Sequence, residues 1–171
     1  VGHLGQHHAR LYAGLPNAVL TGVYDLDAKR AQSVADRYGT VAYGDQAALL
    51  KHVEALSVAA PTSEHHAVVR ACLTAGAHVL VEKPIAVTAG EARELIETAD
   101  RHRRVLQVGH IERFNPAIRS VRPYIGRPAF IECHRLRQFG DRGTDVDVVL
   151  DLMGVAGGWL RVRHRDGQAG Y

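Results

Sequence analysis

Two residues of opposite charge, Glu82 and Lys83, stand between the apolar run 77–81 and Pro84. The run has the apolar, β-branched character of a strand buried on both faces, which is typical of parallel sheets. We therefore expect the pair at the carboxyl edge of a sheet, where open α/β folds bind ligands and an acid and an ammonium can do chemistry. The alternative is an ordinary surface pair before a turn. Pro84 restricts the backbone of Lys83 to an extended conformation. The sequence leaves both the cis and the trans form of the Lys83-Pro84 peptide bond as alternatives.

The chain opens with Gly2-His3-Leu4-Gly5, which fits the last two glycines of a G-x-G-x-x-G loop. In such a loop Gly2 lets the backbone approach a pyrophosphate, and Gly5 lets a helix pack closely on the sheet. The N-terminus of the following helix adds unpaired N–H groups and the positive end of its dipole. These four residues are predicted to bind a dinucleotide. A glycine in an ordinary turn is the alternative.

Asp25 follows Gly5 by twenty residues and ends the next apolar stretch. An acid at that offset accepts hydrogen bonds from the adenosine ribose hydroxyls, which favours NAD over NADP. The alternative role, capping a helix, is already filled by Asp27. Arg30 lies one helical turn away and leaves some affinity for NADP open.

The surrounding pattern alternates strands with helices, which predicts an α/β fold with a doubly wound parallel sheet. Asp27, Ser63 and Thr88 are expected to cap helices, and Leu11 and Tyr12 are expected on the core face of the first helix. We expect strands at 19–24, 41–43, 55–60, 77–81, 105–109 and 129–134, and helices at 8–14, 28–38, 45–51, 64–75 and 89–102.

The composition argues against several classes of function. With 171 residues, 46% hydrophobic, 23% charged and a formal net charge of +3, the chain has the composition expected of a soluble globular protein. The basic residues are spread out without an aromatic platform, so we expect no nucleic-acid partner. No apolar run could span a membrane, and the two distant cysteines favour a cytoplasmic location without disulfides. The eleven histidines form no metal-binding motif, so no metal is expected.

Together these motifs resemble the Gfo/Idh/MocA oxidoreductases over residues 1 to about 153. The resemblance is carried by the glycine loop, Asp25, Ala60-Pro61-Thr62 with His65-His66, and above all Glu82-Lys83-Pro84. Segments 108–116 and 145–153 are similar to the branch of the family that acts on UDP-N-acetylglucosamine-type sugars.

The resemblance implies hydride transfer between NAD, or NADP, and a secondary alcohol of a sugar or nucleotide-sugar. Lys83 would reach the substrate hydroxyl and stabilise alkoxide character or relay the proton, and Glu82 would orient Lys83 or hold the nicotinamide side. The resemblance also implies a homo-oligomeric intact protein. The residues implied at the nicotinamide ribose edge are Pro61, Thr62 and His66, and those near the junction with a substrate domain are His110 and Arg113.

The resemblance stops at the C-terminal part of the chain. We expect a dinucleotide-binding domain at 1–122 and the start of a substrate domain at 123–171, with an aberrant glycine- and arginine-rich tail from 154. The tail replaces the segment in which this family carries an acid/base histidine. We therefore interpret the chain as a fragment that lacks its first strand and most of the substrate domain. The alternative function is a non-catalytic dinucleotide-binding module or an inactive fragment.

Overall fold

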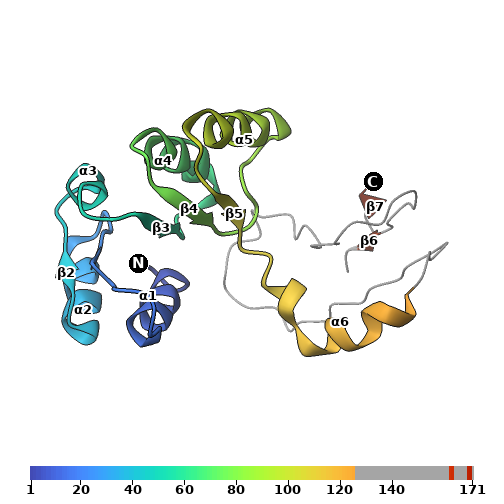
Figure 1. Ribbon diagram of the computed structural model, residues 1–171, viewed down its shortest axis with the longest axis horizontal. Helices are drawn as coiled ribbons and strands as arrows, with labels where there is room; N and C mark the ends of the chain where they lie inside the picture. Colours follow the sequence, from blue (N-terminus) through green and yellow to red (C-terminus); the bar gives the residue numbers. More distant parts are fainter. Residues whose placement is uncertain (126–161, 164–168, 171) are drawn as a thin grey trace. The chain divides into compact units, whose positions relative to one another are not determined.

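The computed structural model describes residues 1–125, 162–163 and 169–170. The chain divides into two units, Val1–Gly109 and His110–Tyr171, and the described helices and strands of both are drawn in Figure 1. The expected strand at 129–134, the segment 145–153 and most of the tail from 154 lie outside the described residues. The domain boundary at residue 122 stays a prediction.

All strands of the first unit pair in parallel, as the sequence predicts. Strands β1 and β2 pair with each other, and a second sheet has the order β3-β4-β5. Because successive parallel strands are joined by helices, the unit is a Rossmann-like α/β fold, and the predicted fold class is confirmed. The strands are β1 (Gly22–Val23), β2 (Val41–Ala42), β3 (Ala55–Val58), β4 (His78–Val81) and β5 (Leu106–Val108).

Helices connect these strands and cover them (Figure 1). None of the helices in the described part of the chain is long and apolar enough to cross a bilayer. The helices of the first unit are α1 (Gly5–Gly14), α2 (Ala28–Tyr38), α3 (Gln46–Leu50), α4 (Thr62–Thr74) and α5 (Ala89–His102). The second unit contains η1 (Ile111–Phe114), α6 (Pro116–Val121), η2 (Arg122–Tyr124) and the antiparallel pair β6 (Val162–Arg163) and β7 (Ala169–Gly170).

Two predicted helix caps are confirmed. The Asp27 carboxylate accepts the backbone N–H groups of Lys29 and Arg30 at the start of α2. Thr88 forms a capping box with Glu91 at the start of α5, so two backbone donors that the helix itself cannot satisfy are paired.

Two local predictions are wrong. Helix α4 starts at Thr62 with Pro61 before it, so Ser63 lies inside the first turn and does not cap the helix. Helix α1 starts at Gly5, and Leu11 is 55% exposed. The reason is that α1 buries its small residues, Gly5 and Ala9, which turns Leu11 toward the surface.

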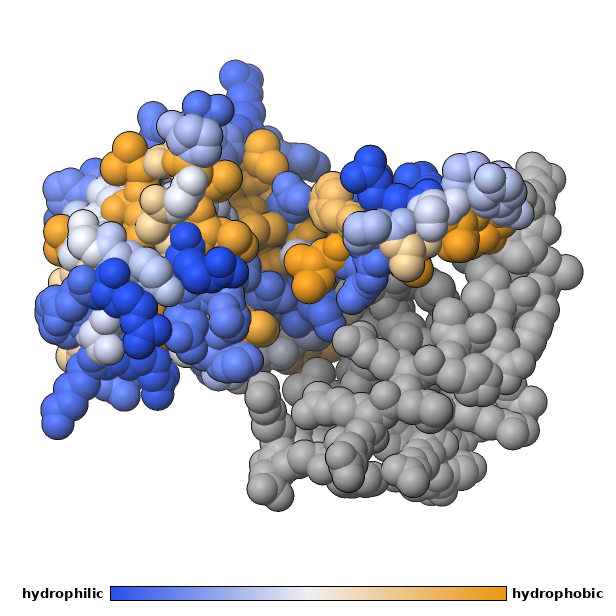
Figure 2. Space-filling view, turned by 90° about the horizontal axis from the view of Figure 1, so that it is seen from below, coloured by the Kyte–Doolittle hydropathy of each residue, from blue (hydrophilic) through white to orange (hydrophobic). Residues whose placement is uncertain are grey.

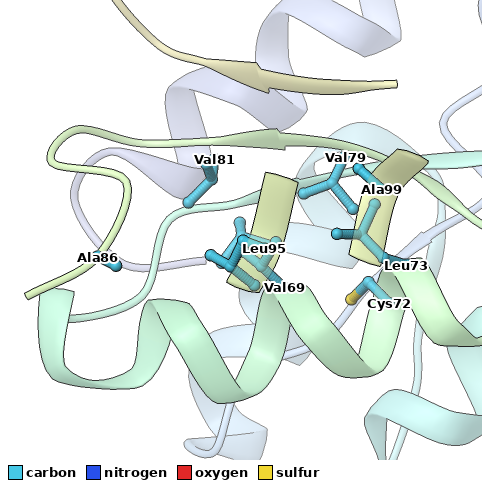
Figure 3. Close-up of a cluster of buried hydrophobic side chains, with 9 residues drawn as sticks. Val69, Cys72, Leu73, Val79, Val81, Ala86, Leu95 and Ala99 are labelled. Atoms are coloured by element: carbon cyan, nitrogen blue, oxygen red, sulfur yellow. The ribbon is translucent and has the colours of Figure 1, made fainter. Parts of the chain in front are cut away.

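The larger hydrophobic core lies between the three-stranded sheet and helices α4 and α5 (Figure 3). Its side chains come from elements that are adjacent in the fold, and a smaller core joins α1, β1 and α2. On the surface, apolar residues lie among polar ones (Figure 2). The larger core consists of Val58, Val69, Cys72, Leu73, Val79, Val81, Ala86, Leu95 and Ala99.

Candidate active site

Glu82 stands at the carboxyl edge of the three-stranded sheet, as expected. Its backbone N–H donates to the Val58 carbonyl at 2.9 Å, and the N–H of Gly109 donates to the Val81 carbonyl at 2.8 Å. The ends of β3, β4 and β5 therefore meet at one level. The carboxylate packs on the backbone of Gly109, where an added Cβ would lie 3.3 Å from Oε1.

The Glu82 carboxylate is held by two donors. The backbone N–H of Lys83 lies 3.3 Å from Oε2, and Nε2 of His8 lies 3.0 Å from Oε1. The His8 ring continues to Ser57, whose hydroxyl lies 3.0 Å from Nδ1 and 2.7 Å from the Tyr12 hydroxyl. The chain of polar groups thus runs from helix α1 through β3 to the sheet edge. The Glu82 side chain is 12% exposed, so this contact is shielded from solvent.

Lys83 follows Glu82 and is partly buried. The peptide bond between Lys83 and Pro84 is cis. Within residues 1–125 its ammonium forms no ion pair. A lysine ammonium that no ion pair engages can donate a hydrogen bond to an approaching oxygen atom.

The two loops beside Lys83 are joined by the buried ring of His65. Its Nε2 lies 3.0 Å from the Ala60 carbonyl and its Nδ1 lies 2.7 Å from the Pro84 carbonyl. His65 is 1% exposed, and the sequence did not single it out for this role.

Pro61 and Thr62 follow at the start of helix α4, so His65 ties their loop to the segment that carries Lys83. His66 points elsewhere, because its Nε2 lies 2.9 Å from Glu94 on helix α5. The predicted roles of Pro61, Thr62 and His66 at a nicotinamide ribose stay predictions.

The geometry of the glycine loop is compatible with a bound phosphate. Helix α1 starts with no side-chain cap. The N–H groups of Gln6 and His7 already donate to the carbonyls of Gly2 and Leu4, whereas the N–H of Gly5 has no acceptor among the described residues and could serve a ligand. Gly2 has open space where a side chain would start, and His3 and Leu4 are exposed beside it. Gly5 is buried, with Val1 and Ala59 within 3.7 Å of an added Cβ. The residues present therefore fit a pyrophosphate.

Asp25 lies two residues after the end of β1, and its carboxylate faces several donors. The amino group of Val1 lies 2.6 Å from Oδ2, and the N–H of Asp27 and the guanidinium of Arg30 lie 2.9 and 3.3 Å from Oδ1. Burial raises the pKa of Asp25, but the hydrogen bonds and the nearby positive charges outweigh it and leave the pKa lower than usual. Asp25 is therefore an ionised acceptor at neutral pH.

Two further predicted residues lie in the second unit. His110 and Arg113 belong to the second unit, where the Arg113 N–H donates to the His110 carbonyl at 3.0 Å. No cluster of three metal-binding side chains occurs in the part of the chain that the structure describes.

Sequence reasoning missed the roles of His8, Ser57 and Tyr12, the last of which it placed only on the core face of its helix. The signal that could have found two of them is the spacing of His8 and Tyr12, which places both on one face of the helix after the glycine loop.

Comparison with known proteins agrees with this geometry. A family model described as "Oxidoreductase family, NAD-binding Rossmann fold" matches residues 1–110. The chain belongs to this family. The resemblance to Gfo/Idh/MocA oxidoreductases that the motifs indicate is confirmed.

The relatives within this oxidoreductase family are dehydrogenases. A UDP-N-acetylglucosamine 3-dehydrogenase of Acidithiobacillus ferrooxidans is 43% identical over 90% of this chain and 49% of its own length. An inositol 2-dehydrogenase of Rubrobacter xylanophilus is 37% identical over 66% of this chain and 33% of its own length. The chain thus spans at most about half the length of these curated relatives.

Solved structures show the same relationship. The UDP-N-acetylglucosamine 3-dehydrogenase GnnA from Acidithiobacillus ferrooxidans superimposes with a TM-score of 0.82 at 43% identity, covering 90% of this chain and 50% of its own. GenD2 from gentamicin A biosynthesis, in complex with NAD, has a TM-score of 0.62 at 31% identity, over 63% of this chain and 32% of its own.

Proposed function

We propose that this protein transfers a hydride between NAD and a secondary alcohol of a nucleotide sugar. The observation that carries the proposal is the Glu82-Lys83 pair at the carboxyl edge of β4, joined by His8 to the helix that starts at the glycine loop. A phosphate-binding helix and a reactive pair are thereby held together in one unit. The 43% identity to a UDP-N-acetylglucosamine 3-dehydrogenase supports the choice of a nucleotide sugar.

Different residues of this chain would bind the cofactor and act on the substrate. The open loop from Gly2 to Gly5 would hold the pyrophosphate, and Asp25 would accept hydrogen bonds from the adenosine ribose. When bound, the dinucleotide supplies the hydride acceptor or donor. Lys83 would donate a hydrogen bond to the reacting hydroxyl oxygen and stabilise its developing negative charge, and Glu82 would keep the segment that carries Lys83 in place.

The preference for NAD follows from charge. The ionised carboxylate of Asp25 would repel the additional phosphate of NADP, and the nearby guanidinium of Arg30 is already engaged with that carboxylate at 3.3 Å. We infer that NAD is the physiological cofactor. A homo-oligomeric intact protein and a cytoplasmic location stay predictions.

A fluorescence titration of the purified chain with NADH and NADPH tests the cofactor. We expect NADH to bind about tenfold more tightly than NADPH, and Asp25→Ala to narrow that ratio, since a repulsive charge is removed. Equal binding of both dinucleotides, or binding of neither by a folded chain, would contradict the proposal.

Turnover with NAD and UDP-N-acetylglucosamine tests the reaction. Lys83→Met should reduce the rate at least about 100-fold while NADH binding stays, since it removes the charge that stabilises the oxygen. Lys51→Met, at an exposed lysine after α3, is the matched control. Binding of NADH without turnover would favour the non-catalytic module.

A further inference from the structure

The strongest unassigned feature of the first unit is the chain of polar side chains that ends at Glu82. It joins Tyr12 and His8 on helix α1, Ser57 on strand β3 and Glu82 after β4. The three distances are 2.7 Å from Tyr12 to Ser57, 3.0 Å from Ser57 to His8 and 3.0 Å from His8 to Glu82. All four residues are partly buried, and the hydrogen bonds between their side chains connect three elements that are far apart in the sequence.

The donors in this chain follow from the chemistry of its ends. An ionised carboxylate can only accept, so the hydrogen between His8 and Glu82 belongs to Nε2 of His8. Nδ1 of a neutral ring then accepts, and its partner is the hydroxyl of Ser57. The oxygen of Ser57 in turn accepts from the hydroxyl of Tyr12. Every group has a partner, and each hydrogen bond points the same way, from Tyr12 toward Glu82.

We propose that His8 is a positioning residue for the reaction, selected in its Nε2–H tautomer by Ser57 and Tyr12, and that it fixes the carboxylate of Glu82 beside Lys83. The inference rests on the proposed function, since it assigns the reacting groups to Glu82 and Lys83. Glu82 is held from three sides, by the ring of His8, by the backbone N–H of Lys83 and by the backbone of Gly109. Without His8 the carboxylate would lose its only side-chain donor among the described residues.

The tautomer can be read directly by NMR of the nitrogen-15-labelled chain at neutral pH, and this readout needs no turnover. The His8 signals are assigned by their loss in His8→Gln. We expect Nε2 to carry the hydrogen and Nδ1 to be unprotonated, and Ser57→Ala to weaken this preference because the donor to Nδ1 is removed. A hydrogen on Nδ1, alone or together with one on Nε2, would overturn the proposal.

A double-mutant cycle tests whether His8 acts through Glu82. His8→Ala should lower kcat about tenfold to 100-fold, in keeping with the loss of a hydrogen bond to a charged group, while the affinity for NADH stays within about twofold. His8→Gln should recover most of the rate, because its amide can donate near the position of Nε2. Arg10→Ala, at an exposed residue of the same helix, should leave the rate unchanged and is the control.

In a Glu82→Gln background the loss caused by His8→Ala should shrink to less than about twofold, because two residues that act through one contact are not additive. An equally large loss in both backgrounds, or a parallel fall in NADH affinity, would show a merely structural role and overturn the proposal. A chain that binds NADH but never turns over would contradict the proposed function, while the NMR measurement would still decide the tautomer of His8.

Discussion

The ring of His65 and the carbonyl oxygen of Pro84 are joined by a contact of 2.7 Å, deep in the first unit. The other ring nitrogen of His65 lies 3.0 Å from the carbonyl of Ala60, so one side chain serves the loops that follow β3 and β4. Lys83 lies in the second of these loops, and Thr62 begins the helix that follows the first. The buried imidazole therefore helps to fix their relative position.

We expect His65→Ala to lower the free energy of unfolding by about 2–4 kcal/mol. The substitution leaves a cavity in place of the buried ring and removes a hydrogen bond to one of the two carbonyl groups that the ring contacts. His66→Ala is the matched control, because the neighbouring ring contacts the half-exposed Glu94 and should contribute less than about 1 kcal/mol. Urea unfolding of the two variants measures the difference. Equal losses would show that the contacts of His65 add nothing beyond those of a surface histidine.

The capping box at the start of α5 gives a second prediction. Thr88→Ala should lower the free energy of unfolding by about 1 kcal/mol, because the N–H of Glu91 loses the Thr88 hydroxyl that lies 3.2 Å away. Thr88→Ser keeps that acceptor and should restore most of the loss. Thr74→Ala, at the exposed end of α4, is the control for the change in side-chain size. A loss in Thr88→Ser as large as in Thr88→Ala would contradict the role of the hydroxyl.

The elements that the sequence predicts well are those whose signals are local. Asp27 and Thr88 begin their helices as expected, since a cap and the turn it satisfies lie within four residues. Helix α1 starts earlier than its periodicity indicates. Gly5 is a poor helix former, but it is buried against Val1 and Ala59, and this tertiary packing outweighs its local preference.

The same distinction between local and non-local signals applies to the residues of the candidate site. The position of Glu82 at a sheet edge follows from the strand before it and was predictable. The contact of Glu82 with His8 joins residues 74 positions apart, so no local pattern could indicate it. The direction of His66 toward Glu94 depends on how helices α4 and α5 pack, which is equally non-local.

Strand β1 leaves no room for a side chain at Gly22. An added Cβ would meet the ring of Tyr43 and would lie 2.9 Å from the carbonyl oxygen of Val41. Because that oxygen belongs to the paired strand, relief requires a backbone shift, and Gly22→Ala should lower the free energy of unfolding by about 1–3 kcal/mol. Gly44→Ala enters open space and is the control. Thermal melting of both variants measures the effect. Equal midpoints would show that the backbone of β1 and β2 accommodates the added methyl group without loss of stability.

Cys72 has no exposed surface and lies in the larger core, where Nε2 of Gln46 contacts its sulfur at 3.1 Å. Burial raises the pKa of the Cys72 thiol from 9.0 to about 11, since the thiolate would lose its hydration. The folded chain should therefore react with thiol reagents far more slowly than the unfolded chain at mildly alkaline pH. The experiment uses a Cys133→Ser background, so that a single thiol is followed.

The same shift makes the contribution of Cys72 to stability depend on pH. The contribution is fully present below about pH 9, where the thiol is protonated in both states. It falls as the pH rises toward about 11, because the unfolded chain releases the proton first, with a slope of up to about 1.4 kcal/mol per pH unit. The difference in unfolding free energy between the Cys133→Ser chain and the same chain with Cys72→Ala cancels the titration of other groups. A difference that stays constant across this range would show that the folded state does not suppress the thiolate of Cys72.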